Sequence, residues 1–236
     1  MGVYDDLGIS RVVNGYATLT SLGGSLMPPP VTRAMMEAAA SFVDMEKLRI
    51  RVCEEIARMT NNEAAFVTTG ASAGILLAAT ACIAGSDPDK RRRLPNTQGM
   101  RAEFVVQRCA HTPHEFSMQH AGGALVSIGD DERATPDELA AGINDNTAAV
   151  FLTPRGDGPQ GMVSVGETVE IAHAAGVPVI VDAAAQLPPP ENLWRFTREL
   201  GADLVIFSGG KGLCGPQSTG LILGRPELID ACVFHA

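Results

Sequence analysis

Apolar residues recur along this chain at spacings that predict helices and strands in alternation. Between Val31 and Met59 the spacing is helical, and a break near Asp44 predicts two helices rather than one. Thr135-Pro136-Asp137 predicts the start of another helix, because threonine caps a first turn and proline fits its first position. Helical spacing and glycine stops predict the remaining helices at 73–84, 114–120, 165–175 and 192–200.

Short apolar runs predict seven strands, at 63–69, 104–107, 124–128, 148–153, 177–181, 204–208 and 219–223. Their alternation with helices is typical of an α/β fold, here a three-layer α/β/α domain over residues 31–236 after an N-terminal extension of residues 1–30. About ten residues and no helix join the last two strands, too few for a parallel crossover. We therefore expect a mainly parallel sheet with one antiparallel strand near its C-terminal end.

Net charge and cysteine content indicate which partners and which cellular compartment to expect. The net charge of −9 over 236 residues argues against a nucleic-acid partner, which a basic face would attract. The basic run 90–93 lies in a polar stretch predicted to be a solvated loop, with a phosphate- or RNA-contacting patch as the alternative. Five cysteines without a C-x-x-C pair favour the reducing cytoplasm. The run 177–181 is too short to cross a bilayer, so we expect no membrane partner.

Ligands of open α/β sheets bind outside the carboxyl ends of the strands. In this sequence, that rule selects polar or glycine-rich segments at five strand ends: 70–72, 109–114, 153–158, 182–186 and 208–211. We expect these segments to form a single site.

Lys211 follows an apolar strand and is preceded by Ser208, Gly209 and Gly210. A loop lysine is ordinarily a surface cation, but a lysine kept at a desolvated strand end can lose its proton and form a Schiff base. The glycines before and after it allow a tight turn and a close approach to a ligand.

Asp182 ends the most apolar strand, so its carboxylate needs a partner. That partner is either a structural group, such as a helix cap or an ion pair, or the protonated ring nitrogen of a pyridinium cofactor. Gln186, four residues on, is placed to contact the same ligand. Gly70-Ala71-Ser72 opens a helix and offers backbone N–H groups to an anion, to which Ser208 would add a hydroxyl.

Three histidines cluster at 111, 114 and 120. Cys109 and two histidines on one loop lack a clear fourth metal ligand, so a metal site is the weaker interpretation. The stronger one is that His111 or His114 stacks on a cofactor ring, although either could simply form hydrogen bonds in its loop. The spacing leaves open which of the two it is.

In combination, these residues resemble a known family. The order Gly70-Ala71-Ser72, then Asp182 to Gln186, then Ser208 to Lys211 is similar to that of fold-type I (aspartate-aminotransferase-like) pyridoxal-phosphate (PLP) enzymes. The nearest branch is that of D-glucosaminate-6-phosphate ammonia-lyase and bacterial selenocysteine synthase (L-seryl-tRNA selenium transferase). The likeness spans nearly the whole chain and includes 22–25, 42–45, 71–74 and 211–217.

The resemblance implies a role for each residue. Lys211 would form the Schiff base with PLP and move protons at the substrate's α-carbon, and Asp182 would pair with the pyridine nitrogen. The other cofactor-binding residues would be Gly70, Ala71, Ser72 and Ser208 at the phosphate, Gln186 near the ring hydroxyl, and His111 or His114 at the ring face.

The resemblance also implies a reaction, α-proton abstraction followed by β-elimination on an amino acid or amino sugar acid, in a homodimer or higher homo-oligomer. The alternatives are a selenium or sulfur transferase acting on aminoacyl-tRNA, and a truncated PLP-domain protein without catalysis. Members of the family are normally longer, so we expect the small C-terminal domain, which often supplies a substrate-binding arginine, to be absent. Where the branch has a glycine-containing turn, this chain has Thr60-Asn61-Asn62-Glu63.

Overall fold

The structure is a computed structural model that describes residues 2–154 and 161–236. A seven-stranded sheet forms its centre, in the order β1-β7-β6-β5-β4-β2-β3. The strands are β1 (Ala64–Thr68), β2 (Glu103–Gln107), β3 (Ala124–Ile128), β4 (Thr147–Leu152), β5 (Val179–Asp182), β6 (Leu204–Ser208) and β7 (Gly220–Gly224). Each of the seven predicted strands is present.

β7 is the antiparallel strand. It pairs antiparallel with β1 and with β6, whereas the other neighbouring pairs of the sheet are parallel. The segment between β6 and β7 contains no helix, so the chain turns back beside β6 instead of crossing over the sheet. The predicted α/β class, with one antiparallel strand near the C-terminal end, is confirmed.

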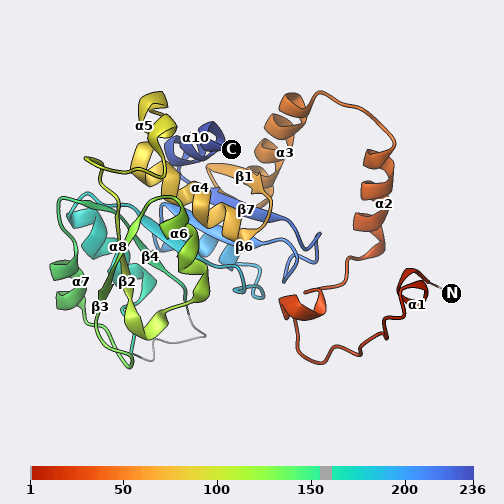
Figure 1. The fold of residues 1–236 in the computed structure, drawn as a ribbon, viewed down its shortest axis with the longest axis horizontal. Coiled ribbons are helices and arrows are strands. Elements are labelled where there is room, and N and C mark those ends of the chain that lie inside the picture. The colour runs from red at the N-terminus through yellow and green to blue at the C-terminus, as the bar shows by residue number, and fades with distance from the viewer. Residues whose placement is uncertain (1, 155–160) are drawn as a thin grey trace.

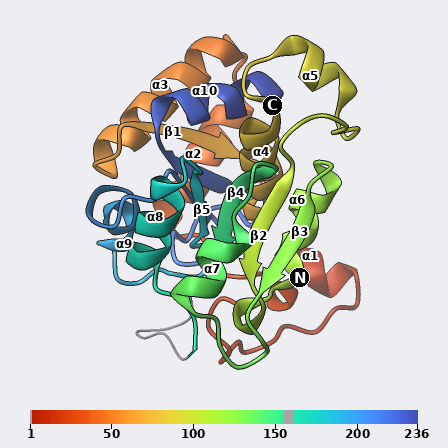
Figure 2. The ribbon, with the colours of Figure 1, turned by 90° about the vertical axis from the view of Figure 1, so that its left-hand side faces the viewer.

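Helices cover both faces of the sheet, which gives three layers (Figures 1 and 2). The helices are α1 (Val3–Asp6), α2 (Pro29–Ala39), α3 (Met45–Met59), α4 (Ala71–Ala84), α5 (Pro88–Arg93), α6 (Phe116–His120), α7 (Pro136–Gly142), α8 (Val165–Ala174), α9 (Asn192–Trp194) and α10 (Pro226–His235). Short 3-10 or π turns are η1 (Thr20–Leu22), η2 (Arg108–Ala110), η3 (Pro113–Glu115) and η4 (Arg195–Glu199).

Two apolar cores lie on either side of the sheet because successive strand residues point to opposite faces. On β2, Phe104 belongs to the core under α4, α6 and α10, whereas Val105 belongs to the core under α7 and α8. Small residues bring α4 close to the sheet: a Cβ on Gly74 would lie 3.0 Å from Ile206 Cγ2. The sheet is therefore buried on both faces, as its apolar strands predict.

Three local features differ from the sequence predictions. The polar stretch after Gly85 contains helix α5 rather than a loop, because the Asp87 side chain accepts hydrogen bonds from the N–H groups of Asp89 and Lys90. Helix α10 was not predicted. Asn61 adopts a φ of 53° after α3, the left-handed position that a glycine often fills, which accounts for the missing glycine in this turn.

The first part of the chain extends away from the sheet. Helix α2 stands apart at the side of the molecule, and α3 returns the chain to β1 (Figure 1). Within the described residues, none of the helices is long and apolar enough to cross a membrane.

Candidate functional site

The carboxyl ends of β1, β5 and β6 lie at one edge of the sheet. Thr68, at the end of β1, and Ser208, at the end of β6, both pair with Gly220 of β7. Asp182 ends β5 and pairs with Ile206 of β6. The predicted segments 70–72, 182–186 and 208–211 therefore leave the sheet at the same edge. Of the predicted segment 153–158, residues 155–158 lie outside the described part of the chain.

Asp182 is 3% exposed, and one hydrogen bond reaches its side chain within the described residues, from the N–H of Ala184 to Oδ1 at 3.0 Å. Burial raises the pKa of Asp182, whereas the Ala184 hydrogen bond and the nearby His114 and Lys211 act to lower it. The carboxylate is thus poorly compensated by the protein, and a cationic ligand would stabilise it.

Lys211 lies in a glycine-rich loop, here called the lysine loop (residues 209–219), that packs tightly on itself. The N–H of Gly209 donates to the Thr219 carbonyl at 2.8 Å, and the N–H of Gly215 donates to the Gly209 carbonyl at 2.7 Å. A Cβ on Gly209 would lie 2.0 Å from Thr219 Oγ1. Neither glycine has a positive φ, so close packing rather than an unusual backbone conformation requires them here.

The N-terminus of α4 lies at the same edge without a side-chain cap. Gly70 precedes the helix with a φ of 113°, and its carbonyl accepts the N–H of Gly74 at 3.0 Å. The first N–H groups of a helix, here those of Ala71 and Ser72 among others, have no partner within the helix. Ser72 is exposed and Ser208 is buried. The arrangement can bind an anion such as a phosphate.

The structure separates the two candidate histidines. His111 Nδ1 lies 2.5 Å from Glu115 Oε2, and its Nε2 lies 3.2 Å from Ser127 Oγ, so both ring nitrogens have protein partners. His114, in contrast, lines a pocket together with Lys211. Of the two, His114 is the one that the structure brings to Lys211.

Gln186 bridges two neighbouring strand ends. Its Nε2 donates to the Pro154 carbonyl, just after β4, at 2.8 Å, and its own carbonyl accepts from Asn192 Nδ2 at 2.6 Å. These contacts hold the segment after Asp182 in place, and within residues 2–154 and 161–236 the Gln186 side-chain oxygen forms no hydrogen bond.

Sequence reasoning missed residues 15–20 of the N-terminal segment. They line a pocket of 720 Å³ together with His114 and Lys211. The sequence contained one signal of this role, because no charged residue occurs between Arg11 and Arg33. Periodicity gave no reason to place this stretch beside a lysine almost 200 residues later.

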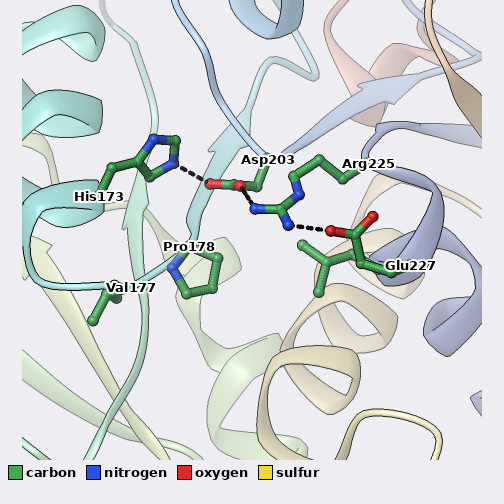
Figure 3. A pocket seen from close by; sticks show the side chains of 8 residues that line it. His173, Val177, Pro178, Asp203, Arg225 and Glu227 are labelled. Carbon is green, nitrogen blue, oxygen red and sulfur yellow. Dashed lines mark hydrogen bonds and ion pairs between the residues drawn. The ribbon is translucent and has the colours of Figure 1, made fainter.

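A second pocket, of 330 Å³, lies beside the starts of β5 and β6, at the opposite edge of the sheet (Figure 3). Asp203 is 1% exposed and accepts from Val179 N at 2.7 Å, from Arg225 Nη1 at 2.8 Å and, across 2.8 Å, contacts His173 Nε2. Arg225 also contacts Glu227. The charged groups satisfy one another, which is typical of a structural network that links β5 and β6 with α8 and the start of α10.

A match to a protein-family model shows which family the chain belongs to. The aminotransferase class-V model matches residues 30–233. The chain belongs to this family. Membership confirms the resemblance to PLP enzymes drawn from the sequence and implies pyridoxal phosphate as the cofactor.

Individual members of the class-V family are similar over nearly the whole chain. D-glucosaminate-6-phosphate ammonia lyase of Salmonella typhimurium is 35% identical over 98% of this chain and 62% of its own length. The 5'-C-glycyluridine monooxygenase-decarboxylase of a Streptomyces species is 38% identical over 97% of this chain and 58% of its own length. The chain thus spans about three fifths of the length of these relatives.

A solved class-V structure agrees with the sequence comparison. The structure of a D-glucosaminate-6-phosphate ammonia-lyase superposes with a TM-score of 0.92 and 33% identity, covering 100% of this chain and 63% of its own. The L-seryl-tRNA(Sec) selenium transferase of Nitratidesulfovibrio vulgaris is more distant, at 28% identity over 93% of this chain and 50% of its own length. Both branches named from the sequence are therefore among the relatives.

Proposed function

We propose that the edge formed by β1, β5 and β6 holds PLP and that Lys211 binds it covalently. Asp182 would pair with the protonated pyridine nitrogen, and the N-terminus of α4, from Gly70 to Ser72, would hold the phosphate together with Ser208. His114 would contact the ring face, and Gln186 would lie near the ring hydroxyl.

The buried Asp182 carboxylate is the observation that carries this proposal. A carboxylate that is 3% exposed, with one hydrogen bond and a raised pKa, is costly for the protein alone. A pyridinium beside it would supply the missing positive charge. The uncapped α4 N-terminus at the same edge has the chemistry that a phosphate requires.

We further propose that the protein containing this chain is a lyase acting on an amino acid or amino sugar acid. PLP, when bound, serves as an electron sink for a negative charge at the substrate's α-carbon. Lys211 removes the α-proton, and a β-hydroxyl departs as water. The resulting enamine takes up one water molecule and is hydrolysed to a keto acid and ammonia.

A covalent-labelling experiment tests the cofactor assignment. The chain is mixed with PLP, its visible absorption band is recorded, and the bond is reduced with borohydride before peptide mass mapping. We expect the band in the unmodified chain, its loss in Lys211→Ala, and the label on the peptide that contains Lys211. Lys90→Ala, in the exposed helix α5, is the control and should keep the band. A label distributed over surface lysines would contradict the proposal.

A second candidate reaction is an oxygen-dependent decarboxylation. The relative that is 38% identical is named for such an activity, and it matches this chain as well as the ammonia lyase does. Oxygen uptake and carbon dioxide release from an amino acid substrate would favour this reaction. Release of ammonia and a keto acid under anaerobic conditions would favour the lyase.

We also propose that the chain forms a homodimer through α2, α3 and the residues between them, 29–59. Among the described residues, the exposed large apolar side chains all lie between Val3 and Met59, with the exception of Phe116. Soluble monomers rarely expose apolar surface on this scale. Light scattering after gel filtration should give twice the mass of the chain, and a monomer at micromolar concentration would contradict this proposal.

A further inference from the structure

We propose that residues 15–20 form one wall of the substrate pocket and recognise an uncharged, hydroxyl-rich side chain of the amino substrate. This inference rests on the proposed function, because it requires Lys211 to be the reactive lysine. It assigns a role to the N-terminal segment, for which neither the sequence motifs nor the cofactor site accounts.

The position of this wall follows from the pocket. Gly15 to Thr20 line the pocket of 720 Å³ together with His114 and Lys211. That volume lies within the range of about 300–1,000 Å³ that is typical of small-molecule sites. The wall thus faces the lysine across a space large enough for a substrate side chain.

The chemistry of the wall determines what it can bind. Tyr16, Thr18 and Thr20 carry hydroxyl groups, and none of the three forms a side-chain hydrogen bond to another described residue. The stretch 12–32 contains no charged residue. A carboxylate or phosphate would find no cation on this wall, whereas hydroxyl groups would find both donors and acceptors. The wall therefore suits a polyol or sugar.

Two sets of contacts hold the wall in position. Asn14 Oδ1 accepts the N–H of Tyr16 at 2.8 Å, and Asn14 Nδ2 donates to the Ala17 carbonyl at 3.0 Å. Ser25 donates to the Gly210 carbonyl through its N–H at 2.9 Å and its Oγ at 3.1 Å. Residues 14–25, here called the N-terminal arm, are thereby attached to the residue that precedes Lys211.

Gln217, near the end of the lysine loop, also helps to attach the N-terminal arm. With its amide nitrogen facing the backbone, it donates to the carbonyls of Gly210 at 3.0 Å and Gly23 at 3.3 Å. Gln217 and Ser25 are accordingly positioning residues, whereas Tyr16, Thr18 and Thr20 would touch the substrate.

The test compares two ligands that share an amino acid head and differ in the side chain. PLP-loaded chain is titrated with glucosaminate, which carries a polyhydroxylated side chain, and with alanine, which carries none. The change in the visible absorption band gives each Kd. The variant Tyr16→Phe/Thr18→Val/Thr20→Val removes the three hydroxyls while keeping the shape of each side chain. Ser21→Ala, which removes a hydroxyl beside the pocket lining, is the control.

We expect the triple variant to bind glucosaminate about tenfold or more weakly, because two or three hydrogen bonds are lost, while its Kd for alanine changes less than about twofold. The control should leave both values unchanged. An unchanged glucosaminate affinity, or an equal loss for both ligands, would overturn the inference while the band itself upholds the cofactor site. If the unmodified chain shows no band, the proposed function fails and this inference fails with it.

Discussion

Ser25 donates two hydrogen bonds to the carbonyl oxygen of Gly210, one from its backbone N–H at 2.9 Å and one from its Oγ at 3.1 Å. The two residues are 185 positions apart in the sequence, and Gly210 directly precedes Lys211. The contact attaches the N-terminal arm to the loop that carries Lys211, the lysine proposed to bind PLP. Loss of this contact would therefore release the backbone next to Lys211 from the arm.

Gly24→Ala should weaken this attachment. Gly24 has a φ of 72°, and an added Cβ would lie 2.3 Å from the Gly210 carbonyl oxygen and 2.1 Å from the side-chain amide of Gln217. Gly23→Ala is the matched control, since Gly23 has a φ of 90° but no atom within 4 Å of the added Cβ. Both variants carry a backbone cost of about 1 kcal/mol, but the steric cost applies to Gly24 alone.

Limited proteolysis measures this difference. We expect Gly24→Ala to be cleaved in the N-terminal arm several times faster than Gly23→Ala, with little change in the cleavage of the rest of the chain. Equal cleavage rates would mean that the arm is not held against Gly210.

Asp182→Asn should stabilise the protein without cofactor while weakening cofactor binding. The substitution removes a buried charge, and the side-chain oxygen can still accept from the N–H of Ala184. We expect the free energy of unfolding at neutral pH to rise by about 1 kcal/mol, measured by urea denaturation, and the Kd for PLP to increase. A variant that is less stable and binds PLP equally well would mean that Asp182 has a purely structural role.

A second measurement compares how the free energy of unfolding depends on pH in the unmodified chain and in Asp182→Asn. Burial raises the pKa of Asp182, so the folded chain holds this proton more tightly than the unfolded chain does. The free energy of unfolding of the unmodified apo chain should fall as pH rises from the ordinary aspartate value through the raised one. The advantage of Asp182→Asn should therefore increase across that window and then stay constant. Parallel pH curves for the two proteins would contradict this.

Substitutions of the two histidines should separate their roles. His114→Ala should shift the visible band of the PLP-loaded chain and weaken PLP binding, whereas His114→Phe should restore part of the affinity by keeping a ring face. His111→Ala should leave the band in place and reduce stability by about 1 kcal/mol, since it removes the contacts with Glu115 and Ser127. Absorption spectra and thermal unfolding of the three variants check both expectations, and the reverse pattern would assign the ring contact to His111.

Asp203→Ala should destabilise the fold at the edge of the sheet opposite the lysine. It leaves the N–H of Val179 without its 2.7 Å acceptor in a buried position, at a cost of about 2–3 kcal/mol. Glu227→Gln, which changes an exposed partner in the same network, should cost less than about 1 kcal/mol. Urea denaturation gives both values. Equal losses, or a loss of the PLP band in folded Asp203→Ala, would contradict a structural role confined to this edge.

Much of the proposed cofactor site could be predicted from the sequence because its determinants are local. Apolar runs such as 204–208 fix strands that are buried on both faces, and each parallel strand delivers the residue at its end to the same edge. Asp182 and Lys211 could therefore be assigned to one site from the positions of their strand ends, whereas the order of the strands within the sheet came from the structure. The antiparallel strand followed from the length of one loop.

Other features depend on contacts that no local pattern encodes. The spacing of His111 and His114 does not distinguish the two residues. The structure does, because His111 contacts Glu115 and Ser127 whereas His114 lines a pocket with Lys211. An added Cβ would clash with Thr219 at Gly209, with Gln217 at Gly210 and with Leu187 at Gly212, and no local sequence pattern encodes these close contacts.

The sequence by itself determined the α/β class, the order of the strands along the chain and the residues at their carboxyl ends, because periodicity and chain length act over a few residues. Only the tertiary structure decided that the N-terminal arm faces Lys211. That contact joins Ser25 to Gly210 across 185 positions, and it exists because the folded sheet brings the lysine loop to where the arm passes.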